Sequence, residues 1–129
     1  MIAVDTNVIV RIVTHDDPDQ ARRAVALFER ERICITKTVL LEVEWVLRFS
    51  YRLPRAVIVS TLRKVVGLGT VEVEDLNEVS MALDWHEQGL DFADALHLAG
   101  SGKVGRFATF DQNMANRAGT LQPMEIIAV

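Results

Sequence analysis

Short apolar segments alternate with longer helix-like segments along the whole of this 129-residue chain. Apolar runs bounded by polar residues predict strands over residues 2–4, 33–36, 70–73, 106–109 and 124–129. Helical spacing predicts helices over residues 7–13, 19–30, 39–49, 55–66, 75–87 and 91–99. Strands that alternate with helices are joined by right-handed crossovers into a mostly parallel sheet covered on both faces. We therefore expect an α/β fold of three layers (α/β/α), in one domain over residues 1–129, with a four- to five-stranded sheet.

Composition limits the environment and the partners. Half of the residues are hydrophobic, which is enough for a real core in one domain. The lone cysteine, Cys34, lies in an apolar strand-like run and is expected to be a small buried hydrophobe. The first residues show no basic leader, and no apolar run approaches the ~20 residues of a membrane span, so we expect a soluble cytoplasmic protein with no membrane contact. The net charge of −4 argues mildly against non-specific nucleic-acid binding. Basic residues remain that could meet phosphates: Arg48, Arg52, Arg55, Arg63, Lys64, Lys103, Arg106 and Arg117.

Two of the predicted strands end on an aspartate. The first apolar run ends at Asp5, and the run over residues 106–109 is followed by Phe110 and Asp111. In an open parallel sheet, ligands bind beyond the carboxyl ends of the strands. Both acids are therefore expected at the ligand-binding edge.

Two further acids stand out on helices. Glu44 precedes Arg48 by four residues, so we expect it on a solvated face with an ion pair. Glu42 has no such partner, and two residues of helix place it roughly 200° around the axis from Glu44. Asp91 opens the last predicted helix, where we expect it to cap the amino terminus. Asp94 lies inside that mostly apolar helix, where a carboxylate needs a donor or a cation.

Asp5, Glu42, Asp94 and Asp111 thus form a candidate metal site. Hard oxygen ligands without a zinc-type cluster of Cys and His select Mg²⁺ or Mn²⁺. Two such ions about 4 Å apart can promote in-line displacement at a phosphodiester. The neighbouring polar residues that could orient the acids are Thr6, Asn7 and Thr109. For Asn7, capping of the first helix and a place at the site are both open.

Four segments carry a resemblance to a known family. They are Val4-Asp5-Thr6-Asn7, residues 39–47 around Glu42, residues 92–99 around Asp94, and Ala108-Thr109-Phe110-Asp111. In this order and spacing they resemble the PIN-domain ribonucleases, and more narrowly the VapC-type toxins of toxin–antitoxin pairs. The resemblance implies a metal-dependent endoribonuclease that uses Asp5, Glu42, Asp94 and Asp111 around Mg²⁺ or Mn²⁺. It also implies an RNA substrate, a homodimer and a small antitoxin protein as partner.

Two alternatives from other classes are weighed against this. A receiver-type phosphoacceptor signalling domain has a similar length, but it needs paired acids after the first strand, and Asp5 is single. A catalytically silent PIN scaffold that binds RNA or a partner also fits the residues. Metal-dependent RNA cleavage separates the three.

Other features favour structural roles. Residues 100–105 contain glycines and Lys103 but follow a helix, which is typical of a helix end and turn, not of a phosphate loop. Trp45 and Trp85 are expected in the core or an interface. Residues 46–59 are rich in large apolar side chains, so Phe49, Tyr51 and Leu53 are expected near a dimer or antitoxin interface, with the junction of two core helices as the alternative.

Overall fold

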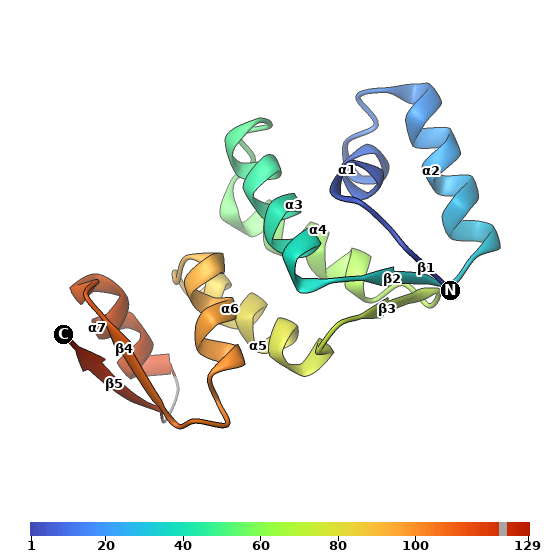
Figure 1. Cartoon of the computed structure of the whole chain (residues 1–129). Helices are drawn as coiled ribbons and strands as arrows, with labels where there is room; N and C mark the ends of the chain where they lie inside the picture. The colour runs from blue at the N-terminus through green and yellow to red at the C-terminus, as the bar shows by residue number, and fades with distance from the viewer. Residues whose placement is uncertain (122–123) are drawn as a thin grey trace. The chain divides into compact units, whose positions relative to one another are not determined.

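The structure is a computed structural model that describes residues 1–121 and 124–129 (Figure 1). In those residues, five short strands alternate with seven helices. In chain order the elements are β1 (Ile2–Ala3), α1 (Thr6–Thr14), α2 (Pro18–Arg30), β2 (Ile33–Ile35), α3 (Lys37–Phe49), α4 (Arg55–Val66), β3 (Val71–Val73), α5 (Leu76–Glu87), α6 (Phe92–Gly100), β4 (Arg106–Thr109), α7 (Gln112–Leu121) and β5 (Glu125–Ala128). The chain divides into two compact units, Met1–Leu76 and Asn77–Val129.

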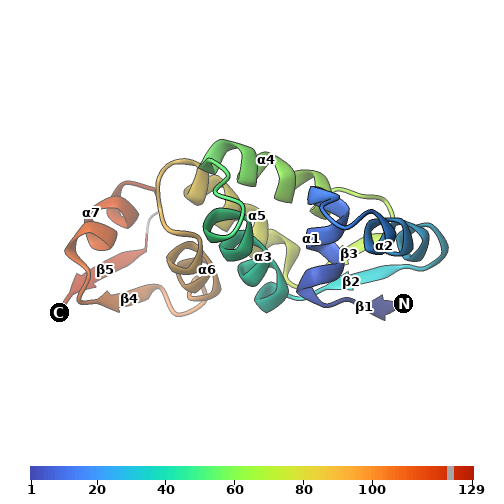
Figure 2. The ribbon, with the colours of Figure 1, turned by 90° about the horizontal axis from the view of Figure 1, so that it is seen from above.

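The first unit is built on a three-stranded parallel sheet in the order β1-β2-β3 (Figure 2). Ile2 pairs with Ile33, and Ile33 pairs with Val71. Two helices make each crossover: α1 and α2 join β1 to β2, and α3 and α4 join β2 to β3. Every strand therefore runs in the same direction, and its carboxyl end leads straight into a helix or a turn at one edge of the sheet.

Local chemistry fixes where these helices begin. Asp17 caps α2 by accepting from the Gln20 N–H at 3.1 Å, and Pro18 occupies the first turn, where no intrahelical N–H bond is needed. Thr36 caps α3 by accepting from Val39 N. The apolar faces behind these caps are buried, and the largest buried residues of this unit are Ile9, Phe28, Ile33, Ile35, Leu40, Leu47, Ile58 and Leu62.

The second unit contains α5, α6 and a β4-α7-β5 segment. The strands β4 and β5 pair in parallel from Arg106↔Glu125 to Thr109↔Ala128, and α7 packs on both of them (Figure 1). The α5–α6 turn is secured by the buried His86, whose Nδ1 lies 2.7 Å from the Leu90 carbonyl oxygen. The largest buried residues of this unit are Leu83, Leu90, Phe92 and Leu98.

The α/β class with parallel strand pairing is confirmed, and each predicted strand and helix forms within a few residues of its expected bounds. The five strands pair as a set of three and a set of two, each within its own unit. The helix α7 was not predicted, because Gln112, Asn113, Asn116 and Gly119 dilute its apolar stripe. The single domain expected over residues 1–129 stays a prediction.

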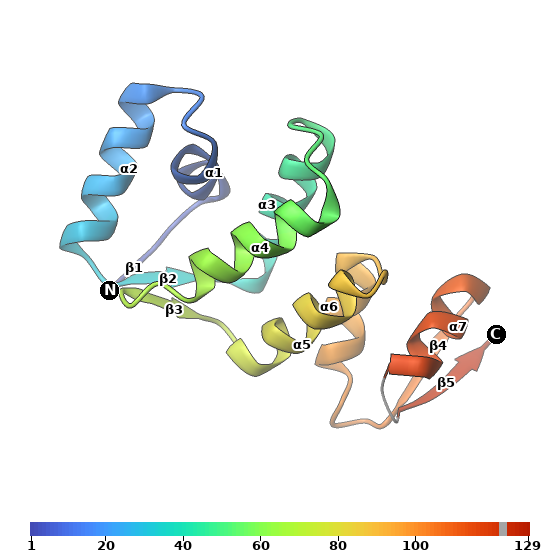
Figure 3. The same ribbon diagram turned by 180° about the vertical axis from the view of Figure 1, so that it is seen from behind.

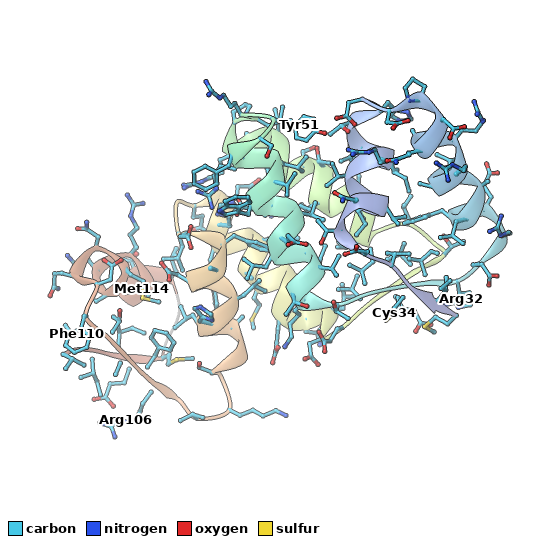
Figure 4. All side chains as sticks on the ribbon, turned by 45° about the horizontal axis from the view of Figure 1, so that its top comes forward. Arg32, Cys34, Tyr51, Arg106, Phe110 and Met114 are labelled. Carbon is cyan, nitrogen blue, oxygen red and sulfur yellow. The ribbon has the colours of Figure 1, made fainter. Side chains whose placement is uncertain are left out.

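The expectation for Cys34 is wrong. Its side chain is only partly buried, while the two neighbours in β2, Ile33 and Ile35, are fully buried. Successive strand residues point to opposite faces, so the two isoleucines take the core face and Cys34 takes the other (Figure 4). In the described residues, no helix is long and apolar enough to cross a membrane.

Candidate functional site

Asp5 lies at the carboxyl end of β1, where the chain turns into α1. Its Oδ1 accepts from the Thr6 N–H at 2.7 Å, and its extended backbone makes it the cap of the helix. The cap is thus Asp5 and not Asn7, so the capping role considered for Asn7 is wrong. A carboxylate has about four lone-pair sites, and one cap bond leaves the others available. Asp5 can therefore begin α1 and still present oxygen to a ligand.

Thr6 connects the first strand end to α3. It is buried, with 4% of its surface exposed, and its hydroxyl donates a hydrogen bond to Glu42 Oε1. Glu42 is exposed on the second turn of α3 and would otherwise be free to sample several rotamers. The Thr6 hydroxyl therefore holds the Glu42 carboxylate beside the residue that follows Asp5.

Glu44 differs from the expectation in one respect. Its ion pair with Arg48 is present, with Arg48 Nε donating to Glu44 Oε2 at 2.9 Å. The expected solvated face is wrong, because the Glu44 side chain is only 1% exposed. Position 44 lies on the same stripe of α3 as the buried Leu40 and Leu47, so helical spacing places its side chain on the buried face. The long side chain of Arg48 reaches that carboxylate from the partly exposed side of the helix.

Two acids beyond those predicted lie at the carboxyl end of β3. Glu74 Oε1 accepts from the Lys37 N–H at 2.9 Å, and Lys37 Nζ lies 2.8 Å from Asp75 Oδ2. These contacts tie the start of α3 to the end of β3. Both acids follow an apolar strand just as Asp5 does, and this position in the sequence could have identified them.

In the second unit, Asp94 lies in the first turn of α6. The expected cap is confirmed, since Asp91 Oδ2 accepts from the Asp94 N–H at 3.3 Å. Partial burial raises the pKa of the Asp94 carboxyl, and the nearby charges of Asp91 and Asp111 raise it further, while His97 lowers it. Asp94 thus lies in the electrostatic field of two other carboxylates of its own unit.

Asp111 follows β4 and starts α7. Its Oδ1 accepts from the Met114 N–H at 3.0 Å, and its own N–H donates to Thr109 Oγ1 at 3.0 Å. The carboxylate is exposed, as is the neighbouring Phe110 (Figure 4). Thr109 therefore orients Asp111 through the backbone, and Asp111 repeats at β4 the position that Asp5 has at β1.

The structure brings the predicted residues together in two groups, one in each unit. Asp5, Thr6 and Glu42 form the first group, and Asp94 with Asp111 forms the second. Within residues 1–121 and 124–129, no group of three or more Asp, Glu, His or Cys side chains is already placed to hold a metal ion. The chemistry of the donors, all carboxylate with hydroxyl support, fits a hard divalent cation.

Comparison with known proteins identifies the class. The profile of the PIN domain family matches residues 2–119, so the chain belongs to the PIN domain family. PIN domains are generally nucleases and typically use divalent metal ions, and the seven helices and parallel sheets of the described residues agree with the three-layer α/β/α fold expected. No curated protein matches the chain. All four predicted acids lie within the matched segment.

Proposed function

We propose that this protein is a metal-dependent endoribonuclease in which Asp5, Glu42, Asp94 and Asp111 together hold Mg²⁺ or Mn²⁺. One repeated observation carries the proposal. In each unit an aspartate that follows a strand and caps a helix is coupled to a second, helix-borne acid: Asp5 to Glu42 through Thr6, and Asp111 to Asp94 through their charges. Because PIN domains are generally nucleases, we interpret these paired acids as ligands of a catalytic metal ion.

Each residue has a distinct task in this proposal. The four carboxylates supply oxygen ligands, and the Thr6 hydroxyl and the Thr109 hydroxyl keep Glu42 and Asp111 in place. A bound divalent ion lowers the pKa of a water molecule and neutralises phosphate charge, which favours in-line hydrolysis of a phosphodiester. We expect products with a 5′-phosphate and a 3′-hydroxyl.

We further propose that the protein is the toxin of a toxin–antitoxin pair and forms a homodimer. Trp45 and Phe49 on α3 are 51% and 55% exposed, and their rings are in tilted contact, with 4.9 Å between centroids and 41° between planes. Exposed aromatic pairs of this size are typical of a protein interface. Tyr51, expected at the same interface, has its hydroxyl bound within the chain to Asp16 and Arg11 (Figure 4), and its place at an interface stays a prediction.

The test of catalysis uses purified protein and an end-labelled single-stranded RNA with Mg²⁺, Mn²⁺ or EDTA. Asp5→Asn, Glu42→Gln and Asp94→Asn should each abolish metal-dependent cleavage while the circular dichroism spectrum stays unchanged. The matched control is Asp19→Asn, which removes a carboxylate from the exposed surface of α2. It should cleave RNA as the parent does.

Metal binding has a readout that does not depend on activity. A cation that binds only the folded state at a hundred times its Kd stabilises by about 2.7 kcal/mol, which is several degrees in Tm for a domain of this size. The parent should show this shift with Mn²⁺, and Asp94→Asn should show little of it. If the parent neither cleaves RNA nor gains stability with Mn²⁺, the protein is a catalytically silent PIN scaffold.

A further inference from the structure

A groove with a basic lining runs between α1 and α2 in the first unit, where these two helices pack side by side (Figure 3). It has a volume of about 310 Å³. The residues that line it are Asn7, Val8, Arg11, Gln20, Arg23, Ala24, Leu27 and Arg30. Five of them lie on one stripe of α2, because positions 20, 23, 24, 27 and 30 recur at helical spacing.

The polar part of the lining suits an anion. Three of the lining residues are arginines, Arg11, Arg23 and Arg30, and none of the described residues that line the groove is acidic. Arg23 is 68% exposed and pairs with Asp19 at 3.1 Å. Such a surface ion pair contributes little to stability, so Arg23 can leave it to bind a ligand. Planar guanidinium groups bind phosphate oxygens in pairs of hydrogen bonds.

Arg11 is held in place before any ligand binds. Its Nε donates to Gln20 Oε1 at 2.7 Å, and its Nη1 lies 3.1 Å from Asp16 Oδ1 and 3.4 Å from the Tyr51 hydroxyl. Its side chain is only 25% exposed. A guanidinium fixed on several sides loses little rotamer freedom when a ligand binds, so Arg11 is a preorganised part of the groove.

The groove also has an apolar part. Val8, Ala24 and Leu27 contribute it, and Ala24 is buried. A lining that combines cationic and apolar side chains suits a single nucleic-acid strand, which has a charged backbone and apolar base faces. An inorganic anion would use only the arginines.

We infer that this groove, defined by the eight lining residues above, binds the phosphodiester backbone of the RNA strand next to the cleavage site. The inference rests on the proposed function, and it assigns a substrate path to the face between α1 and α2. The position supports it: Asn7, one of the lining residues, lies two residues after Asp5, on the first turn of the helix that Asp5 caps. A strand held by the arginines would therefore continue to the first group of acids.

An acidic protein segment is the other anion that such a groove could take. RNA is favoured because α1, which lines the groove, begins at Asp5, an acid of the proposed metal site. A carboxylate repels an acidic peptide and, with a divalent cation, attracts a phosphodiester. The two ligands differ in how their binding depends on salt, since each phosphate contact with single-stranded RNA adds about 0.7 to the slope of log K against log salt.

Fluorescence anisotropy tests the inference with a labelled single-stranded RNA of about 12 nucleotides, a length that fits typical single-strand sites. The background is Asp94→Asn, which prevents cleavage under the proposed function and lies in the other unit. Arg23→Gln and Arg30→Gln are added singly and together. The matched control is Arg22→Gln, because Arg22 is 74% exposed on the same helix and pairs with the same Asp19 but does not line the groove.

We expect each groove variant to weaken RNA binding about tenfold at low salt, the order expected for one lost charge-assisted contact, and to lower the salt slope by about 0.7. Arg22→Gln should change neither quantity. A competing glutamate-rich peptide of equal length should bind at least tenfold more weakly than the RNA. Unchanged Tm values for all the variants make the comparison valid.

Two results would overturn the groove assignment. The first is RNA binding by Arg23→Gln/Arg30→Gln equal to that of Arg22→Gln, and the second is tighter, arginine-dependent binding of the glutamate-rich peptide, which would make the groove a protein-docking site. Either result leaves the proposed nuclease intact if the parent cleaves RNA. Arginine-dependent RNA binding by a parent that never cleaves would support the groove and overturn the proposed catalysis.

Discussion

The two units each place a pair of acids at a strand end and a helix, but they hold the second acid in different ways. In each, a strand ends, an aspartate follows, and that aspartate caps the next helix: Asp5 after β1 and Asp111 after β4. In the first unit the second acid, Glu42, is held by a buried hydroxyl. In the second unit the second acid is Asp94, whose pKa is raised first by its partial burial and then by the nearby carboxylates of Asp91 and Asp111.

The difference separates two ways of preparing a carboxylate for a cation. A hydrogen bond from Thr6 fixes the direction in which Glu42 presents its oxygens. Burial and repulsion around Asp94 do not fix direction but make the ionised form costly, and a bound cation would remove that cost. The first unit is therefore expected to be sensitive to changes of shape, and the second to changes of charge and pH.

The largest effect expected concerns Glu44, an acid of the first unit whose buried carboxylate is paired with Arg48. Glu44→Gln breaks the ion pair between this buried carboxylate and the partly exposed Arg48, and we expect a loss of about 3 kcal/mol, or roughly 150-fold in the folding equilibrium, in urea titrations. Below its Tm the variant should still cleave RNA. Glu42→Gln is the comparison, with almost unchanged stability and no cleavage. The reverse pattern would mean that the roles on α3 are exchanged.

Next in size is the Thr6 hydroxyl. Thr6→Val keeps the shape of the buried side chain but removes the donor to Glu42, and supporting bonds of this kind are worth about 10- to 100-fold in activity. We expect that loss in the initial rate of RNA cleavage, with the change in stability near 1 kcal/mol. Thr6→Ser restores the hydroxyl and should restore most of the rate. Equal rates for the Val and Ser variants would show that Glu42 needs no such support.

Two substitutions of Asp111 distinguish its role as a helix cap from the role of its charge in the second unit. Asp111→Asn keeps a capping acceptor for Met114 N, whereas Asp111→Ala loses it. We expect the Ala variant to lose about 1 kcal/mol and the Asn variant to lose much less, as measured by thermal melts. Both should cleave RNA poorly, because both lack the carboxylate. Normal cleavage by Asp111→Asn would leave the residue with a structural role only.

The smallest effect is the pH dependence around Asp94. Because its pKa is raised in the folded state, the folded protein binds this proton more tightly than the unfolded chain does. The ionised carboxylate therefore lowers stability at neutral pH, and the loss is regained as the pH falls through the raised pKa. In EDTA, Asp94→Asn should melt at the same temperature as the parent or slightly above it at pH 7, and the difference should shrink toward pH 4. A variant that melts well below the parent at pH 7 would identify Asp94 as a structural residue.

Much of the fold was readable from the sequence because its signals are local. Pro18 and Asp17 mark the start of α2, Asp91 marks α6, and the isoleucines around Cys34 mark β2. The helix α7 was not readable, since its apolar stripe is short and contains Gly119. Its position depends on its packing against β4 and β5, the strands that flank it in the sequence, and the residues of the helix alone do not show this packing.

For the candidate site, the sequence by itself determined which acids stand at strand ends and inside helices: Asp5, Glu42, Asp94 and Asp111. Only the tertiary structure decided what each of them contacts. The Thr6 hydroxyl reaches Glu42 across 36 residues of chain, and Glu44 proved to be buried although its ion pair was predicted. Caps and ion pairs one turn apart follow from the period of the helix. Burial and contacts between distant segments depend on how the helices pack on the sheet, and a linear pattern does not contain that information.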